Sequence, residues 1–221
     1  MTTTVRHARP DAVSPELTLR QRLCEKAIEH FGRFGFDRSM LEMSFATDVD
    51  QEVLRELFGS IEGLRAACDD YVQSTVRAAK TEALTSRDPR TWFNALADID
   101  SFAPTMSYFV RTLQTGDATG RELLQKMTDT VEGYLEDAVR AGTVKPSHDP
   151  KARARFLVLC GAGAFLMYRQ MHDETNDMAA VLRDYARDVL MPAMEVYTYG
   201  IMADDNIYRA FLANPGQASA G

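Results

Sequence analysis

The stretch RLCEKAIEHFGRFGFDRSMLEMSFATDVDQEVLRELFGSIEGL, residues 22–64, decides how this chain folds. Its apolar residues recur at every third or fourth position, the spacing that places them on one face of an α-helix. Gly35 interrupts the pattern, and glycine is the residue that most readily takes the left-handed conformation just beyond a helix end. The stretch therefore predicts one long helix that ends near Gly35, followed by shorter helices.

Two short helices are predicted after Gly35. Ser39, with Glu42 three residues later, is a capping box in which each side chain satisfies a backbone N–H of the other residue. Residues 47–50 form a tight turn, and Asp50 is a natural N-cap for the next helix. The inward face of that helix holds Val53, Leu54, Leu57 and Phe58. Two short helices joined by about four residues behind a longer one form a helix-turn-helix.

The rest of the chain continues the helical periodicity, and no segment alternates polar and apolar residues as a strand would. Asp88-Pro89 and Asp149-Pro150 each combine an N-cap with a proline suited to the first helical position. Gly142 ends the helix before the second of these pairs, and Pro192 ends or kinks the last long helix. The predicted fold class is all-α, with an N-terminal three-helix helix-turn-helix domain followed by a larger helical domain.

Charge and composition limit the classes of function. A net charge of −7 and a pI near 5.2 argue against a protein that coats nucleic acid or anionic membranes through bulk electrostatics. The longest apolar run, residues 156–168, is shorter than the roughly 20 residues of a membrane span and predicts a buried helix. The first residues form no secretory signal, which favours a cytoplasmic location without a membrane partner. Core thiols are the expected role of Cys24, Cys68 and Cys160.

No residue pattern indicates catalysis, a metal site or a cofactor. The histidines never fall at metal-ligand spacing, no Gly-x-Ser-x-Gly elbow occurs, and the carboxylates follow no acid/base motif. Gly161-Ala-Gly163 lacks the third glycine and the preceding strand of a dinucleotide-binding loop. We expect no catalytic residues, no metal and no cofactor, and a helical enzyme with a buried pocket is the weakest alternative.

Residues 22–64 resemble the N-terminal domain of TetR-type bacterial transcriptional regulators. The residues in register are Ala27, Phe31, Gly35, Ser39, Met40, Met43, Val49, Leu54, Phe58, Ser60, Glu62 and Leu64. The resemblance implies a flexible N-terminal arm at 1–14 and a helix-turn-helix DNA-binding domain at 15–62. It further implies a ligand-binding and dimerisation domain at 63–212 and a disordered tail at 213–221.

The half of the motif that would face DNA departs from the family pattern. Asp48 stands where a turn glycine is usual, Asp50 replaces a serine, Arg55 a tyrosine and Ile61 a lysine. Five acids lie between Asp48 and Glu62, and each costs ~0.5 kcal/mol near phosphates in a screened, water-like medium. Summed over two half-sites, with one favourable Arg55 subtracted in each, the net penalty is about 4 kcal/mol. The free energy that separates specific from non-specific binding is ~4–10 kcal/mol.

The resemblance nevertheless implies that the helix around Gln51 enters a major groove. Gln51 is suited to adenine, and Arg55 is suited to guanine or to the DNA backbone. Arg6 and Arg9, in the N-terminal arm, would contact the backbone or an adjacent minor groove. The predicted DNA-binding residues of the domain are Arg20, Arg22, Arg38, Ser39, Asp50, Gln51, Glu52, Arg55 and Ser60.

Aromatic and methionine side chains gather in the helices of the second domain. Such stripes usually fill a core, whereas the resemblance implies that some line a site for a small apolar or aromatic molecule. The candidate ligand-binding residues are Trp92, Phe93, Met106, Phe109, Met127, Tyr134, Phe165 and Tyr168. The resemblance also implies a homodimer formed through helices within residues 152–198.

The leading hypothesis is a dimeric, ligand-responsive regulator, most simply a repressor, that binds a double-stranded DNA operator and is released by a small-molecule effector. The alternative is a TetR-fold protein with weak or lost DNA binding, which binds a small molecule or presents its acidic domain to a basic protein.

Overall fold

The computed structural model describes residues 15–115 and 118–214, and in these ranges the chain forms helices and no strands. The elements are α1 (Pro15–Phe34), α2 (Met40–Thr47), α3 (Gln51–Phe58), α4 (Ile61–Thr85), α5 (Pro89–Ala97), the 3-10 helix η1 (Ile99–Phe102), α6 (Ala103–Gln114), α7 (Ala118–Ala141), α8 (Pro150–Met171), α9 (Met178–Tyr199) and α10 (Asn206–Ala213). The predicted all-α fold class is confirmed. The predicted N-terminal arm at 1–14, including Arg6 and Arg9, and residues 215–221 of the predicted tail lie outside the described residues.

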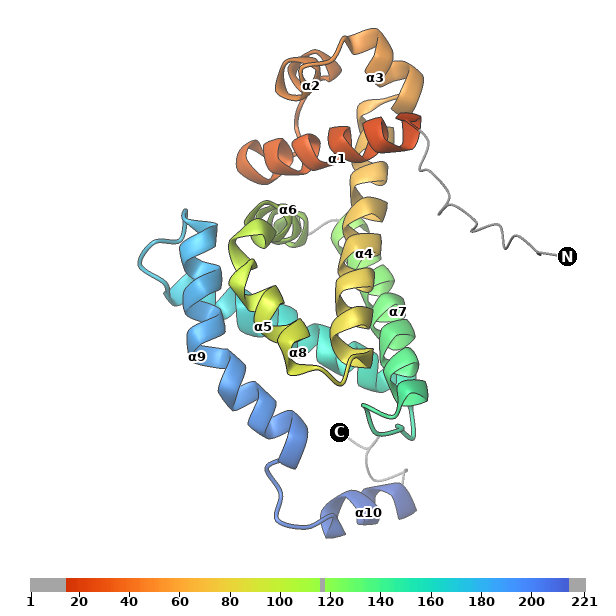
Figure 1. Ribbon diagram of the computed structural model, residues 1–221, viewed down its shortest axis with the longest axis vertical. Coiled ribbons are helices and arrows are strands. Elements are labelled where there is room, and N and C mark those ends of the chain that lie inside the picture. The colour runs from red at the N-terminus through yellow and green to blue at the C-terminus, as the bar shows by residue number, and fades with distance from the viewer. Residues whose placement is uncertain (1–14, 116–117, 215–221) are drawn as a thin grey trace, which may run out of the picture.

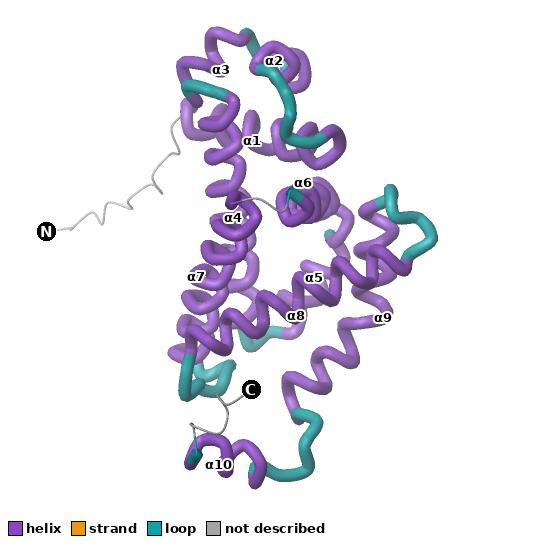
Figure 2. Tube along the Cα trace, turned by 180° about the vertical axis from the view of Figure 1, so that it is seen from behind, coloured by secondary structure: helices purple, strands orange, loops and turns teal. Residues whose placement is uncertain are grey.

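The molecule is elongated, with the predicted helix-turn-helix at one end (Figure 1). Helices α1, α2 and α3 gather at this end and are called the head from here on. Helix α4 runs from the head into the body, which comprises α4 to α9, and α6 lies directly beneath α1. Helix α10 lies at the end of the molecule opposite the head, and the view from behind shows the same arrangement (Figure 2).

Local residue chemistry starts and ends the helices at the predicted places. The carboxylates of Asp88 and Asp149 accept hydrogen bonds from backbone N–H groups in the first turns of α5 and α8, at 3.0 Å and 2.9 Å. Gly35 and Gly142 have φ angles of 87° and 71°, so both take the left-handed conformation just beyond the ends of α1 and α7. The starts of α5 and α8 and the ends of α1 and α7 could therefore be predicted from local residue chemistry alone.

Pro192 was expected to end or kink helix α9, and the helix does not end there. The helix continues through Pro192 to Tyr199. A proline inside a helix removes one backbone hydrogen bond, because it has no N–H to donate to the carbonyl four residues earlier. Pro192 is exposed, so water can hydrate that carbonyl and the helix persists.

Helix α8 is less buried than its apolar sequence predicted. One face packs into the body through Ala154, Val158 and Phe165, while Phe156 and Met167 on the other face are 62% and 66% exposed. Cys160 is exposed as well, so the expectation of three core thiols holds only for Cys24 and Cys68. The sequence pattern failed to predict the exposed face because a single chain covers only one side of this helix.

None of the described helices combines the length and hydropathy of a membrane span.

Three apolar clusters organise the molecule. The head core contains Leu23, Cys24, Ala27, Ile28, Phe31, Met43, Leu54, Phe58, Leu64, Cys68, Val72 and Tyr108. The α6–α9 cluster is built around Val110, Phe165, Val181 and Leu182. The α7–α8 cluster is built around Val131, Leu135, Ala154 and Val158. Helix α6 supplies Tyr108 to the head core and Val110 to the α6–α9 cluster, so it joins the head to the body.

Helices α1 and α6 approach closely at Gly32. A Cβ atom added to Gly32 would lie 3.0 Å from the Cβ of Ser107 and 3.0 Å from the backbone nitrogen of Tyr108. Such distances are too short for a normal contact, and the backbone nitrogen of Tyr108 cannot move without α6. The absence of a side chain at Gly32 therefore allows the head to rest on α6.

We expect Gly32→Ala to lower the free energy of unfolding by about 1–3 kcal/mol, the usual cost of overpacking. This loss should appear although alanine is intrinsically the better helix former by about 1 kcal/mol. Urea denaturation measures the change. Gly133→Ala on α7 is the matched control, because the added Cβ there meets only the flexible end of Arg77. Equal stability of wild type and Gly32→Ala would contradict the close contact.

Candidate nucleic-acid interface

Helix α2 begins at the predicted capping box. The Ser39 hydroxyl accepts a hydrogen bond from the backbone N–H of Glu42 at 3.2 Å, and the Glu42 carboxylate accepts one from the backbone N–H of Ser39 at 2.7 Å. This backbone bond, together with a second bond from the Ser39 hydroxyl, lowers the pKa of Glu42. The charge of Glu42 therefore serves to start the helix.

The turn between α2 and α3 is made by an aspartate in a glycine conformation. Asp48 has a φ of 58° and is the one non-glycine residue in the described chain with a positive φ. Aspartate tolerates the left-handed region better than most side chains, so it can replace the glycine usual at this position. The sequence shows that aspartate stands where the family usually has glycine. It does not show that the left-handed backbone conformation is kept.

Asp50 occupies the N-cap position of α3 as predicted, but its carboxylate accepts no capping hydrogen bond. The expectation that Asp50 uses its charge to cap its own helix is therefore wrong. The side chain is exposed, and its negative charge remains at the start of the predicted reading helix. Asp50 still benefits from its position near the helix N-terminus, where the macrodipole favours a negative group.

Helix α3 separates a buried face from an exposed face. Leu54 and Phe58 are 0% and 8% exposed and anchor the helix in the head core. Gln51 is half-buried, while Glu52 and Arg55 are exposed. Gln51 and Arg55 are four residues apart and so share one side of the helix. Two residues that are both predicted to contact DNA bases or phosphates must lie on the same side of the helix, as Gln51 and Arg55 do.

Two of the predicted arginines hold the head together. Arg20 donates a hydrogen bond to the carbonyl of Leu57, and its guanidinium lies 4.6 Å from the ring centroid of Phe58. Arg38 donates to the carbonyl of Phe34 and lies 3.4 Å from the carboxylate of Glu42. These contacts fix α3 and the start of α2, so both arginines have structural roles that the sequence did not indicate.

The other predicted contacts are on the surface. Arg22 and Arg55 are exposed, and neither forms an ion pair within the described part of the chain. Ser39 and Ser60 are exposed at the N-termini of α2 and α4, and Ser60 accepts a hydrogen bond from the backbone N–H of Gly63 at 3.2 Å. Helix N-termini favour phosphate groups, which suits both serines to the DNA backbone.

The predicted ligand-binding residues do not form a single cluster. The α6–α9 cluster receives Met106, Phe165 and Tyr168. The α7–α8 cluster receives Met127 and Tyr134. Phe109 is half-buried on α6. On α5, Phe93 is 66% exposed, and the Lys80 ammonium lies 6.0 Å from the ring centroid of Trp92. The ligand-binding role of these residues stays a prediction.

Head and body meet around Tyr108, which is 1% exposed. Its hydroxyl donates a hydrogen bond to the carboxylate of Asp69 at 2.7 Å, and its ring meets that of Phe36 edge-on at 5.3 Å. The guanidinium of Arg65 stacks 3.7 Å from the centroid of the Phe36 ring. Burial raises the pKa of Asp69, although the hydrogen bond from Tyr108 opposes this shift. The junction is therefore a packed, hydrogen-bonded contact between α4, α6 and the segment before α2.

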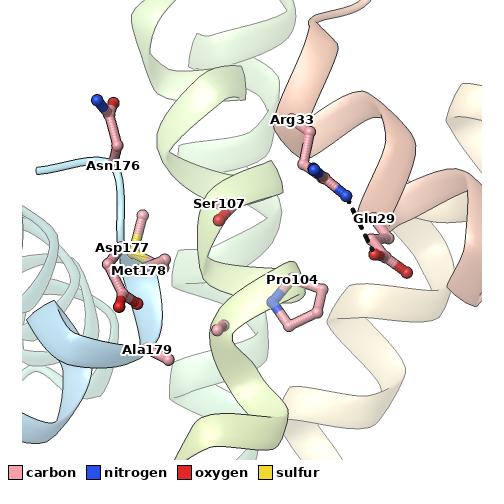
Figure 3. Close-up of a pocket in the computed structure, with 9 residues that line it drawn as sticks. Glu29, Arg33, Pro104, Ser107, Asn176, Asp177, Met178 and Ala179 are labelled. Atoms are coloured by element: carbon pink, nitrogen blue, oxygen red, sulfur yellow. Dashed lines mark ion pairs between the residues drawn. The ribbon is translucent and has the colours of Figure 1, made fainter.

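An open cleft of about 550 Å³ lies beside this junction (Figure 3). Glu29 and Arg33 of α1 form an ion pair at 3.9 Å on one side, and residues 176–179 at the start of α9 lie on the other. Pro104 and Ser107 of α6 lie between them. The cleft separates the head from the start of α9. In the described residues no group of three histidines, cysteines or carboxylates could hold a metal ion.

Comparisons with known proteins agree with this arrangement. Residues 100–203 match the family model described as "Tetracyclin repressor-like, C-terminal domain". The chain is also similar to the "HTH-type transcriptional regulatory protein RaaS" of Mycobacterium tuberculosis, with 50% identity over 207 residues that cover 94% of this chain and 98% of that protein. The chain belongs to the TetR family of transcriptional regulators. TetR family regulators bind DNA and typically dimerise, and the resemblance noted in residues 22–64 is confirmed.

The structure also contains residues of this TetR-family chain that sequence reasoning missed. Tyr108 lies on α6, within the segment predicted as the second domain, yet it belongs to the head core. Its partner Asp69 lies on α4, 39 positions earlier in the chain. A buried carboxylate next to a tyrosine hydroxyl leaves no local pattern in the sequence, so only the fold could bring these two residues together.

The raised pKa of Asp69 predicts a pH dependence of stability. The folded protein binds the Asp69 proton more tightly than the unfolded chain, whose aspartate pKa is about 3.9. The associated stabilisation is complete below about pH 4 and is lost as pH rises through the folded-state pKa. Asp69→Asn still accepts the Tyr108 hydrogen bond and cannot ionise, so its stability relative to wild type should rise with pH.

Urea unfolding of wild type and Asp69→Asn between about pH 4 and pH 7.5 measures this difference. Tyr108→Phe is the companion variant, because it removes the hydrogen bond that opposes the pKa shift of Asp69. It should therefore show a steeper loss of stability with pH than wild type. A difference between wild type and Asp69→Asn that stays constant with pH would contradict the assignment.

Proposed function

We propose that this protein is a homodimeric, ligand-responsive transcriptional repressor whose α3 helices read a double-stranded DNA operator. The observation that carries the proposal is that Gln51 and Arg55 share the side of α3 that faces away from the head core. The chain belongs to the TetR family, and its head has the helix-turn-helix arrangement. With two heads in one dimer, the half-sites lie about one helical turn apart. The relative's printed name, a helix-turn-helix transcriptional regulator, supports the same role.

The head must bind DNA in spite of its acids. Residues 1–64 hold eight lysine and arginine residues against eleven aspartate and glutamate residues. Arg22 and Arg55 supply exposed guanidinium groups, and the N-termini of α2 and α4 supply backbone N–H groups for phosphates. Because few cations contribute at each half-site, the dependence of operator affinity on salt concentration should be shallow for this class of protein.

The proposed dimer forms through α8 and α9, within residues 152–198. The outer face of α8 is uncovered, with Phe156, Leu159 and Met167 more than half exposed. Cβ atoms added to Gly161 and Gly163 would meet no atom within 4 Å, so the chain itself leaves room there for another helix. An exposed apolar face of this kind on a helix of a soluble protein marks an interaction surface.

Ligand response is supported by the position of α6. Tyr108 of this helix lies in the head core, and Val110, two residues later, lies in the α6–α9 cluster. A small apolar or aromatic molecule that enters this cluster near Met106 and Phe165 would displace α6. Tyr108 of α6, on which the head packs, would move with it. The molecule releases the operator if it binds the displaced state more tightly than the state that binds DNA.

One feature favours the alternative of a TetR-fold protein that has lost DNA binding. Phe45 and Leu41 of α2 are 79% and 53% exposed, so the head also presents apolar surface beside its acids. Such a surface suits a protein partner. Retention on heparin or random DNA at low salt discriminates the two functions: salt-sensitive retention, together with a gel shift of the gene's own upstream region, supports the repressor.

We expect Arg55→Ala to weaken binding of the upstream DNA and to reduce the salt slope by about one unit per half-site. Gel shifts at several salt concentrations measure both quantities. Arg90→Ala is the matched control, because it removes the same charge from an 82% exposed side chain on α5, outside the head. Unchanged affinity and slope for Arg55→Ala would remove the support for α3 as the reading helix.

Overpacking the α6–α9 cluster should mimic an effector. Val110→Phe enlarges a 3% exposed side chain on α6. The larger side chain should shift α6 against the head and lower operator affinity several-fold. Val131→Phe is the control, since it adds the same volume to the α7–α8 cluster, to which α6 contributes no residue. Equal operator affinities for both variants at matched thermal stability would show that α6 does not transmit the change.

A further inference from the structure

Two cysteine side chains lie in contact inside the head core. Cys24 of α1 and Cys68 of α4 are 4% and 0% exposed. The Cys68 thiol hydrogen-bonds to the Cys24 side chain and lies 3.8 Å from the Cys24 carbonyl oxygen, although the two residues are 44 positions apart. Core packing requires only small apolar groups at these positions, whereas two thiols in contact can also react with each other.

The surroundings of Cys24 favour its reactive form, the thiolate. The hydrogen bond from Cys68 and the positive charge of Arg20, one helical turn earlier on α1, lower the pKa of Cys24, although burial opposes this shift. The same hydrogen bond, together with burial, raises the pKa of Cys68. A thiolate attacks an oxidant, whereas a protonated thiol does not. The pair therefore combines one nucleophile, Cys24, with one thiol that stays protonated until the first has reacted.

The edge of the head core next to the pair decides which oxidant can reach it. Tyr71, one turn after Cys68 on α4, donates a hydrogen bond to the carboxylate of Glu25, the residue that follows Cys24. Glu25 is exposed and Tyr71 is half-buried, so this edge borders on water. A hydroperoxide is small and uncharged and can reach Cys24 when the edge opens locally. A bulky disulfide oxidant cannot pass such an opening, so the site suits a hydroperoxide.

We propose that Cys24 and Cys68 form a peroxide-sensitive disulfide that joins α1 to α4 and lowers the affinity of the head for its operator. The Cys24 thiolate attacks one oxygen of the hydroperoxide, the O–O bond breaks, and the other oxygen leaves as water or an alcohol. The Cys68 sulfur then attacks the resulting sulfenic acid, the S–O bond breaks, and the hydroxide leaves with the Cys68 proton as water. The two cysteines together lose two electrons and two protons, which the peroxide gains.

The disulfide disturbs the head because the core around it has no free space. An S–S bond is about 2.05 Å long, much shorter than a contact between unbonded sulfur atoms, so its formation draws α1 toward α4. Leu23 and Leu64 beside the cysteines are 2% and 0% exposed and must shift with the helices. Leu54 and Phe58 of α3 pack in the same core, so the shift reaches the proposed reading helix. This effect on DNA rests on the function proposed above, whereas the disulfide itself does not.

Peptide mass spectrometry tests the disulfide without DNA. Trypsin places Cys24 in the peptide 23–26 and Cys68 in the peptide 66–77. After hydrogen peroxide treatment of the full chain and blocking of the remaining thiols, these peptides should be joined, with a mass two hydrogen atoms below their sum, and should separate on reduction. The exposed Cys160 is the internal standard, because it shows that the oxidant was active. Buried cysteines that stay reduced, or gain oxygen without a link, while Cys160 is oxidised overturn the disulfide.

Gel shifts of the upstream DNA test the effect on the operator, in a Cys160→Ser background that removes the exposed thiol. Peroxide should weaken binding roughly tenfold, equivalent to about 1.4 kcal/mol of binding free energy, and dithiothreitol should restore it. Cys24→Ala and Cys68→Ala are the matched controls. Each should bind DNA as the reduced protein does and should not respond to peroxide, although both retain every methionine.

The outcomes separate this proposal from the proposed function. An equal loss of binding in the two alanine variants, or a linked protein with unchanged operator affinity, overturns the redox effect. A chain that forms the link but binds no DNA even when reduced supports the disulfide and contradicts the repressor.

Discussion

The burial of Tyr108 in the head core is the contact on which the rest of the structure depends. This tyrosine comes from the body, yet its ring packs among residues of α1 and its hydroxyl bonds to Asp69 of α4. The missing side chain of Gly32 lets α1 rest directly on the backbone of α6. The head therefore has no complete core without α6, and a movement of α6 cannot leave the head unchanged.

This dependence offers a route for the proposed ligand response. Helix α4 is anchored in the head core by Leu64, and Leu84 near its far end packs on the α7–α8 cluster. Helix α6 crosses near the head and is anchored in the α6–α9 cluster. Packed clusters shift between discrete arrangements more readily than they deform continuously. A change in the α6–α9 cluster is thus passed to the head through α6, which contributes Tyr108 to the head core.

Sequence reasoning succeeded where the deciding interactions are local. Capping residues such as Ser39 and Asp149, and helix-ending glycines such as Gly35, act within a few residues of their own position. It failed where distant residues decide: the Tyr108–Asp69 bond, the engagement of Arg20 with α3, and the exposed face of α8. The missing cap of Asp50 is a smaller failure, because side-chain direction at a turn depends on backbone angles that the sequence leaves open.

The acidic head makes the body of the molecule important for the proposed DNA binding. In the proposed complex each head offers few cations to its half-site, so one head alone is expected to bind DNA weakly. Joining two heads turns the second binding step into an intramolecular one and raises the overall affinity without any new DNA contact. Whatever stabilises the proposed dimer, including the exposed face of α8 far from the head, would then contribute to operator affinity. The proposed dimer would thus retain DNA binding with fewer of the family's basic phosphate contacts, because dimer stability would compensate for their loss.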